Sequence, residues 1–170
     1  KGTAHPVIAG TLVLDGVNAG QAGGRARIEA NGPVNAVAVR ANGSGLAAGS
    51  PVNFDLSGTV DGPARIVRLA ALTAGVRGES IRLLAPATVR LADGVSIDRL
   101  LLGARQSELE VAGRISPTLN ATARLRAGAP ALALVPGLLG QGSVTIDAKL
   151  AGLAAPPTGT VRVQAVGLRA

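Results

Sequence analysis

The chain has 170 residues, and 47% of them are hydrophobic, which excludes a disordered chain. Phe54 is its one aromatic residue, and Cys, Met, Trp and Tyr are absent. The 24 glycines and 10 prolines exclude a helical bundle and favour short strands joined by turns. The net charge of +7 comes mainly from arginines that alternate with apolar residues, a pattern typical of a solvated sheet face.

The pattern of the first hundred residues predicts strands separated by turns. Alternating apolar and polar residues predict strands at roughly 6–14, 24–30, 34–41, 52–60, 64–72, 80–91 and 94–102. Turns are predicted at Asp15-Gly16, Asn31-Gly32-Pro33, Asn42-Gly43, Asp61-Gly62-Pro63, Asp93-Gly94 and Ser116-Pro117. The stretches 16–24 and 42–50 are expected to be the loosest linkers. After Ile97 the apolar phase slips, which predicts a β-bulge or a strand buried on both faces.

Strict alternation with a period of two residues dominates the second half. It predicts four strands, at 108–115, 118–126, 143–150 and 160–165. In each of them the aliphatic residues share one face and the polar residues share the other. The run from Pro130 to Leu139 interrupts this pattern. We expect it to form a short helix that covers one end of the sheet.

The residue types needed for common catalytic and metal sites are missing. His5 is the one histidine, so a Ser–His–Asp site would have to use it, and zinc sites of the usual nitrogen and sulfur type are excluded. Platforms for single-stranded nucleic acid need several stacking aromatics, and Phe54 is the one aromatic residue of the chain. We therefore expect no catalytic residue, no metal, no cofactor and no nucleic-acid partner, and we expect that the protein is not an enzyme.

The order of short patterns in the last two-thirds of the chain resembles a known family. These patterns lie at 81–87, 93–102, 108–115, 130–139, 142–152 and 155–163. From about Pro63 to the end, the chain resembles the C-terminal conserved region of TamB, the translocation and assembly module subunit, in the wider AsmA-like group. The first sixty residues share with that region only the general pattern of short strands and turns.

The resemblance implies a long, curved, mostly antiparallel sheet folded lengthwise, a β-taco, with an apolar inner groove. It implies a protein anchored in the inner membrane that crosses the periplasm and meets an outer-membrane barrel partner of the TamA type. The implied functions are phospholipid transport and outer-membrane protein assembly. We expect a single β-domain over 1–170 that is a fragment of a longer β-rich envelope protein.

The alternation also selects candidate groove residues. The residues expected to line the groove as a passive apolar wall are Leu109, Val111, Leu119, Leu125, Val144, Ile146, Val161 and Val163. Four basic residues are expected to face water: Arg114, Arg124, Lys149 and Arg162.

Other interpretations fit the same pattern. The apolar faces of a β-sandwich would pack on each other and leave no groove. A chaperone-like module would offer a sheet edge to unfolded barrel strands. A secreted structural β-repeat is also possible from pattern alone, but the net charge of +7 and the small number of asparagines argue against it.

Overall fold

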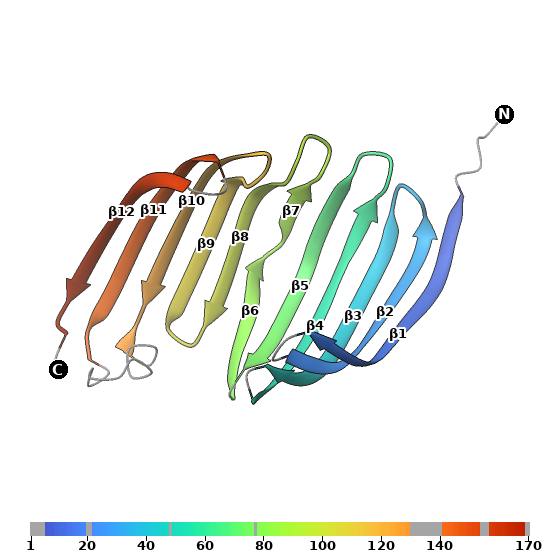
Figure 1. Cartoon of the computed structure of the whole chain (residues 1–170), viewed down its shortest axis with the longest axis horizontal. Helices are drawn as coiled ribbons and strands as arrows, with labels where there is room; N and C mark the ends of the chain where they lie inside the picture. The colour runs from blue at the N-terminus through green and yellow to red at the C-terminus, as the bar shows by residue number, and fades with distance from the viewer. Residues whose placement is uncertain are drawn as a thin grey trace. The chain divides into compact units, whose positions relative to one another are not determined.

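The computed structural model describes residues 6–19, 22–47, 49–76, 78–129, 141–153 and 157–168. Across these residues the chain folds into β-strands that pair antiparallel, which confirms the predicted all-β, antiparallel fold class (Figure 1). The helix predicted at 130–139 lies outside the described residues. By internal packing the chain divides into two compact units, Lys1–Arg82 and Leu83–Ala170. The expectation of a single domain stays a prediction, and the units are taken in turn.

The first unit is built from long hairpins in chain order. Its strands are β1 (Val7–Ala19), β2 (Ala22–Pro33), β3 (Val37–Ala47), β4 (Ser50–Asp61), β5 (Ile66–Val76) and the first half of β6 (Glu79–Ala85). Each strand pairs antiparallel with the next strand in the sequence. Neighbouring strands in Figure 1 therefore run side by side in sequence order.

The second unit repeats this arrangement. Its strands are β7 (Ala87–Arg90), β8 (Ser96–Ala104), β9 (Ser107–Arg114), β10 (Thr118–Ala127), β11 (Ser143–Leu153) and β12 (Pro157–Val166). Strands β8 to β12 pair in sequence order, and the short β7 pairs with β8. The four strands predicted from strict alternation are therefore confirmed as β9 to β12.

Each unit consists of one layer, and the described residues bury few side chains. The buried hydrophobic residues are Val37, Ala41, Ala87 and Ala121. A compact monomer of this mass exposes about 7,600 Å², whereas this chain exposes 10978 Å². Because the strands belong to one sheet and so few of the described side chains are buried, neither unit has the packed core of the alternative β-sandwich.

Several local predictions are confirmed. Turns follow Asp61 and lie around Asp93-Gly94, and a bend lies at Ser116-Pro117. The Asp61 carboxylate accepts a hydrogen bond from the Ala64 backbone N–H at 3.0 Å, which closes the first of these turns. The phase slip after Ile97 is a β-bulge, since the register of β8 against β9 shifts between Ile97 and Leu100.

Two predicted turns are wrong, and the linkers placed beside them lie in strands at residues 16–19, 22–24, 42–47 and 50. Asp15-Gly16 lies inside β1, where the register shifts between Leu14 and Val17, so the positive φ of Gly16 (65°) serves a bulge. Asn42-Gly43 lies inside β3, directly opposite Phe54. A Cβ on Gly43 would lie 2.6 Å from the Phe54 ring, so this glycine makes room for the ring.

Two further boundaries are corrected. The predicted turn at Asn31-Gly32-Pro33 is the end of β2, and the turn itself follows at residues 34–36. The predicted strand at 80–91 is two strands, β6 and β7, separated at Pro86. Proline lacks the N–H that a continuous strand donates to its neighbour, which explains the break.

Asp98 anchors β7 to the bulge in β8. Its Oδ1 atom accepts hydrogen bonds from the backbone N–H of Thr88 at 2.7 Å and of Arg99 at 2.6 Å. Desolvation raises the pKa of Asp98, but the hydrogen bonds from Thr88 and Arg99 and the charge of Arg90 outweigh it, so the pKa lies below its ordinary value. The ionised carboxylate therefore stabilises this junction.

We expect Gly43→Ala to destabilise the protein by about 1–3 kcal/mol, because the new Cβ would meet the Phe54 ring and the Arg25 carbonyl oxygen. Urea unfolding at equilibrium measures the change. Gly10→Ala in β1 is the control, since a Cβ there meets nothing within 4 Å. It should change stability by less than about 0.5 kcal/mol or raise it slightly. Equal effects at both positions would contradict this explanation of Gly43.

We expect Asp98 to make stability depend on pH in the acid range. Because its folded pKa is depressed, its contribution is complete above the ordinary value of 3.8 and is lost as the pH falls below that value toward the folded pKa. Urea unfolding of the wild type and of Asp98→Asn between pH 5 and pH 2 should show the two stabilities converging in acid. A constant difference across this range would contradict the assignment.

Candidate functional site: the aliphatic face of the second unit

Strand register gathers aliphatic side chains into a row across the second unit. Paired residues on antiparallel strands share a face of the sheet. On each strand from β8 to β12, one aliphatic residue is paired directly with an aliphatic residue of the neighbouring strand. This central row consists of Leu102, Leu109, Leu125, Ile146 and Val163. Neighbouring members lie about 4.8 Å apart along the hydrogen-bonding direction, so the row is continuous.

The other predicted residues lie on the same face as this row. Val111 and Val161 are two residues from Leu109 and Val163 on their strands, and Val144 is two residues from Ile146. Leu119 has the same parity in β10 as Leu125. The structure thus brings all eight predicted residues onto one surface, here called the aliphatic face. Whether this face lines a groove stays a prediction.

Sequence reasoning missed part of this face. Leu100 pairs with Val111 and Leu102 pairs with Leu109, so both belong to it. Their face could not be assigned until the position of the bulge was known. Before the bulge the odd-numbered residue Ile97 lies on the aliphatic face, and after it the even-numbered residues Leu100 and Leu102 do. The small side chains were also missed. Those on this face are Ala121, Ala123, Ala127, Ala148 and Ala165.

The aliphatic face is open rather than packed. Among its described side chains only Ala121 is buried, while those of β8 to β11 are otherwise half-buried. On β12 the valines are largely uncovered, with Val161 63% and Val163 60% exposed. This is an unusual state for a continuous aliphatic row, and it is the main chemical feature of the unit.

The opposite face carries a ladder of alternating charge. Register places four charged residues in one line: Glu110, Arg124, Asp147 and Arg162. Arg99 bonds Glu110 at 3.1 Å, and Arg124 bonds Asp147 at 2.5 Å. The hydrogen bond to Asp147 and the charge of Asp147 raise the pKa of Arg124 further above its ordinary value. The two arginines are exposed and the carboxylates of Glu110 and Asp147 are 38% and 35% exposed, so solvent screens each pair and it adds little stability.

The four basic residues predicted to face water all lie on this polar face. Arg114 opposes Asn120 and donates to the Asp93 carbonyl oxygen at 3.2 Å. Lys149 opposes Thr122 and Thr160. A hollow of about 210 Å³ lies beside the ladder, lined by Glu110, Thr122, Arg124, Asp147 and Lys149 among others.

The first unit has the same two-faced chemistry. Its register aligns an aliphatic row made of Leu12, Ile28, Ala41, Leu56 and Leu72. On the other face Arg27 bonds Glu29 at 2.7 Å. Both units therefore present one aliphatic and one polar surface. The alternation at 52–60 indicated this face for β4, although no residue of the first unit was selected as a candidate.

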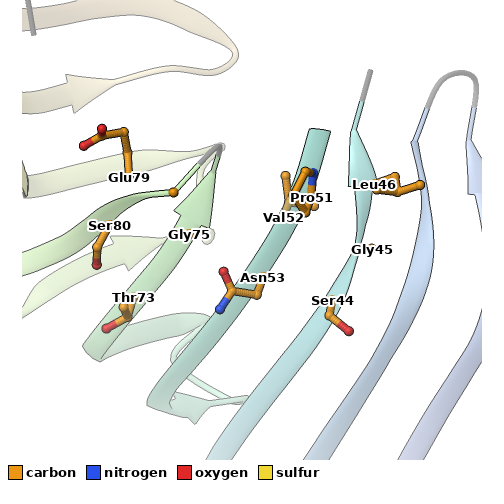
Figure 2. Close-up of a pocket in the computed structure, with 11 residues that line it drawn as sticks. Ser44, Gly45, Leu46, Pro51, Val52, Asn53, Thr73, Gly75, Glu79 and Ser80 are labelled. Carbon is orange, nitrogen blue, oxygen red and sulfur yellow. The ribbon is translucent and has the colours of Figure 1, made fainter. Parts of the chain in front are cut away.

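A hollow of about 680 Å³ lies on the polar face of the first unit, near the ends of β3 to β6. Figure 2 shows the side chains of Asn53, Thr73 and Ser80 around it. At its centre the Asn53 carboxamide lies over Gly75, where a Cβ would collide with the carboxamide oxygen. The hydroxyl and amide groups that line it are exposed, so it is a shallow depression rather than a built binding site.

Within the described ranges, no group of three or more His, Asp or Glu side chains is placed to hold a metal ion. No helix among the described residues is long and apolar enough to cross a membrane. No family model, no curated protein and no solved structure matches this chain.

We expect the central row to contribute stability according to burial. Leu125 has row neighbours on both sides and is half-buried, so Leu125→Ala should destabilise the protein by about 1–2 kcal/mol. Val163 is mostly exposed, so Val163→Ala should cost less than about 0.5 kcal/mol. Chemical unfolding of both variants provides the test, and an equal loss at the two positions would contradict the order of burial.

Proposed function

We propose that this chain is a non-enzymatic, periplasmic section of a TamB-like bridge between the inner and outer membranes. Its aliphatic face shields hydrophobic cargo, most simply the acyl chains of phospholipids. The observation that carries this proposal is a continuous aliphatic row across five strands of one sheet, half-buried on β8 to β11 and largely exposed on β12.

Physical chemistry supports a cargo of this kind. Water-exposed aliphatic surface gains about 25 cal/mol per Å² when it is covered, and each buried methylene of an acyl chain gains about 0.8 kcal/mol. The gain needs no directional contact, so a smooth aliphatic wall can hold chains of different length and let them slide. The role of each lining residue is thus passive, with no cofactor and no bond chemistry.

Side-chain size supports an open groove rather than a filled core. In a lengthwise-folded sheet the aliphatic face would turn inward. Alanines at positions 121, 123, 127, 148 and 165 leave space above the backbone. Aromatic side chains, which would fill such a space with 150–250 Å² each, are missing from the second unit. Curvature into a β-taco is therefore part of the proposal.

The cellular setting is proposed from the resemblance of residues 63–170 to TamB. In that setting the full-length protein is anchored in the inner membrane and meets a TamA-like outer-membrane barrel. The aliphatic face would then serve phospholipid movement, outer-membrane protein assembly or protein secretion. The polar face, with its paired arginines and carboxylates, would lie toward the periplasm.

The direct test is native mass spectrometry of the protein purified from an envelope extract, with identification of the bound lipids. We expect co-purified phospholipid in the wild type. Val144→Asp and Ile146→Arg each place a charge on the aliphatic face, and desolvating that charge is costly, so bound lipid should fall at least about tenfold.

Thr145→Asp is the matched control. Thr145 lies between these two residues on β11 but belongs to the polar face, opposite Arg126 and Gln164. This variant should keep its lipid, because the new charge meets water and an arginine. Circular dichroism confirms that all three variants fold. Lipid-free wild type, or equal loss in the control, would refute a lipid-binding aliphatic face.

A further inference from the structure

The charged side chains of β2 to β5 all lie on one face of the first unit. The other face, which contains Ile28, Ala41 and Leu56, carries no charged residue within these four strands. With β6 included, the charged face holds five arginines, and all of them are exposed to solvent. They are Arg25, Arg27, Arg40, Arg68 and Arg82. This surface of β2 to β6 is called the arginine face.

The carboxylates between these arginines are too few to balance them. Glu29 lies directly opposite Arg40 but bonds Arg27 at 2.7 Å, so one carboxylate faces two guanidinium groups. Asp55 is the other carboxylate between the arginines. Among the described residues, Arg40 and Arg68 have no ion-pair partner. The arginine face therefore keeps an excess of positive charge that its own side chains do not neutralise.

The second unit pairs more of its arginines. Three of its guanidinium groups lie within ion-pair distance of a carboxylate: Arg99 with Glu110, Arg124 with Asp147, and Arg126 with Glu108. On the arginine face, the pair of Arg27 with Glu29 is the one ion pair between described residues. A guanidinium group whose charge is balanced by a bonded carboxylate attracts a further anion less strongly. The unpaired arginines of the first unit are thus the better anion-binding groups.

The arginine face spreads its charges in two directions. From Arg27 on β2 to Arg82 on β6 there are four strand spacings, which amount to about 19 Å. Arg25 and Arg68 lie in rows that are six residues apart along the strands, or about 20 Å. A linear polyanion would follow one row at a time, whereas a plane of phosphate groups can meet all five guanidinium groups together.

We propose that the arginine face of the first unit docks on an anionic phospholipid surface. Guanidinium groups bind phosphate oxygens in a bidentate manner, and each basic residue held near an anionic surface adds to the attraction. Arg40 and Arg68 contribute most, because no described carboxylate is bonded to either of them. The arginines lie on the face opposite the aliphatic row, so docking does not require cargo on that row.

Vesicle co-sedimentation with the full chain measures docking. Vesicles with equal amounts of phosphatidylglycerol and phosphatidylcholine should bind the wild type, and vesicles of phosphatidylcholine alone should bind it at least about tenfold more weakly. Raising the salt concentration from about 0.1 M to about 1 M shortens the range of charge interactions from about 10 Å to about 3 Å. The higher salt concentration should therefore release the protein from the anionic vesicles.

Two matched double variants test which arginines dock. Arg40→Gln combined with Arg68→Gln should weaken binding to the anionic vesicles at least about tenfold. Arg99→Gln combined with Arg124→Gln removes the same charge from ion-paired positions of the second unit. This control should weaken binding less than about threefold, because paired and screened arginines attract the surface less. Circular dichroism confirms that both variants fold.

The carboxylates provide the reciprocal test. Glu29→Gln releases Arg27 from its ion pair, so it should strengthen binding to the anionic vesicles about threefold. Glu110→Gln makes the same charge change and releases Arg99 on the second unit. It should leave binding nearly unchanged, because that unit does not form the docking surface.

Four results would overturn the proposal. Equal losses in the two double variants would show that net charge alone attracts the vesicles. Salt-resistant binding to neutral vesicles would show that the aliphatic face inserts instead. Soluble polyphosphate that displaces the protein at the phosphate concentration of the vesicles would make a linear polyanion the partner. Failure of the wild type to bind anionic vesicles would also refute docking, while phospholipid co-purified on the aliphatic face would remain a separate result.

Discussion

Backbone pairing between neighbouring strands is the interaction on which this structure depends. Most strands contain nine or more residues and pair with their neighbours over nearly their whole length, while four hydrophobic side chains among the described residues are buried. Each hydrogen bond adds only about 0.5–1.5 kcal/mol, so the ladder must be long. The aliphatic rows add stability because each side chain covers part of the apolar surface of its cross-strand neighbours. The rows themselves remain half-buried to exposed, and the proposed function depends on this accessible aliphatic surface.

The faces of the strands could be predicted from the sequence, whereas the register could not. Face assignment needs only the parity of each residue, which is why Leu109, Leu125, Ile146 and Val163 come from four strands and still share a surface. The alignment of these residues in one row depends on the lengths of the hairpin connections, which the pattern does not encode. The charge ladder from Glu110 to Arg162 was missed for the same reason.

The wrong turn predictions share a physical cause. Glycine is required both where φ is positive and where another group approaches the backbone closely. In Asn42-Gly43 the second requirement applies, and the approaching group is the ring of Phe54, eleven residues further along the chain. In Asp15-Gly16 the first applies, but within a bulge. Asn-Gly and Asp-Gly are equivalent turn signals, so only the cross-strand neighbours show which requirement the glycine meets.

The two faces of the second unit favour different surroundings because they offer different groups. The aliphatic face offers no hydrogen-bonding group, so it favours any apolar chain and discriminates by size alone. The opposite face offers guanidinium and carboxylate groups along the charge ladder, so it favours water and ions. An acyl chain laid on the charged face would remove these groups from water without replacing their interactions, which costs free energy. The difference between the faces therefore directs apolar cargo to the aliphatic side of the second unit.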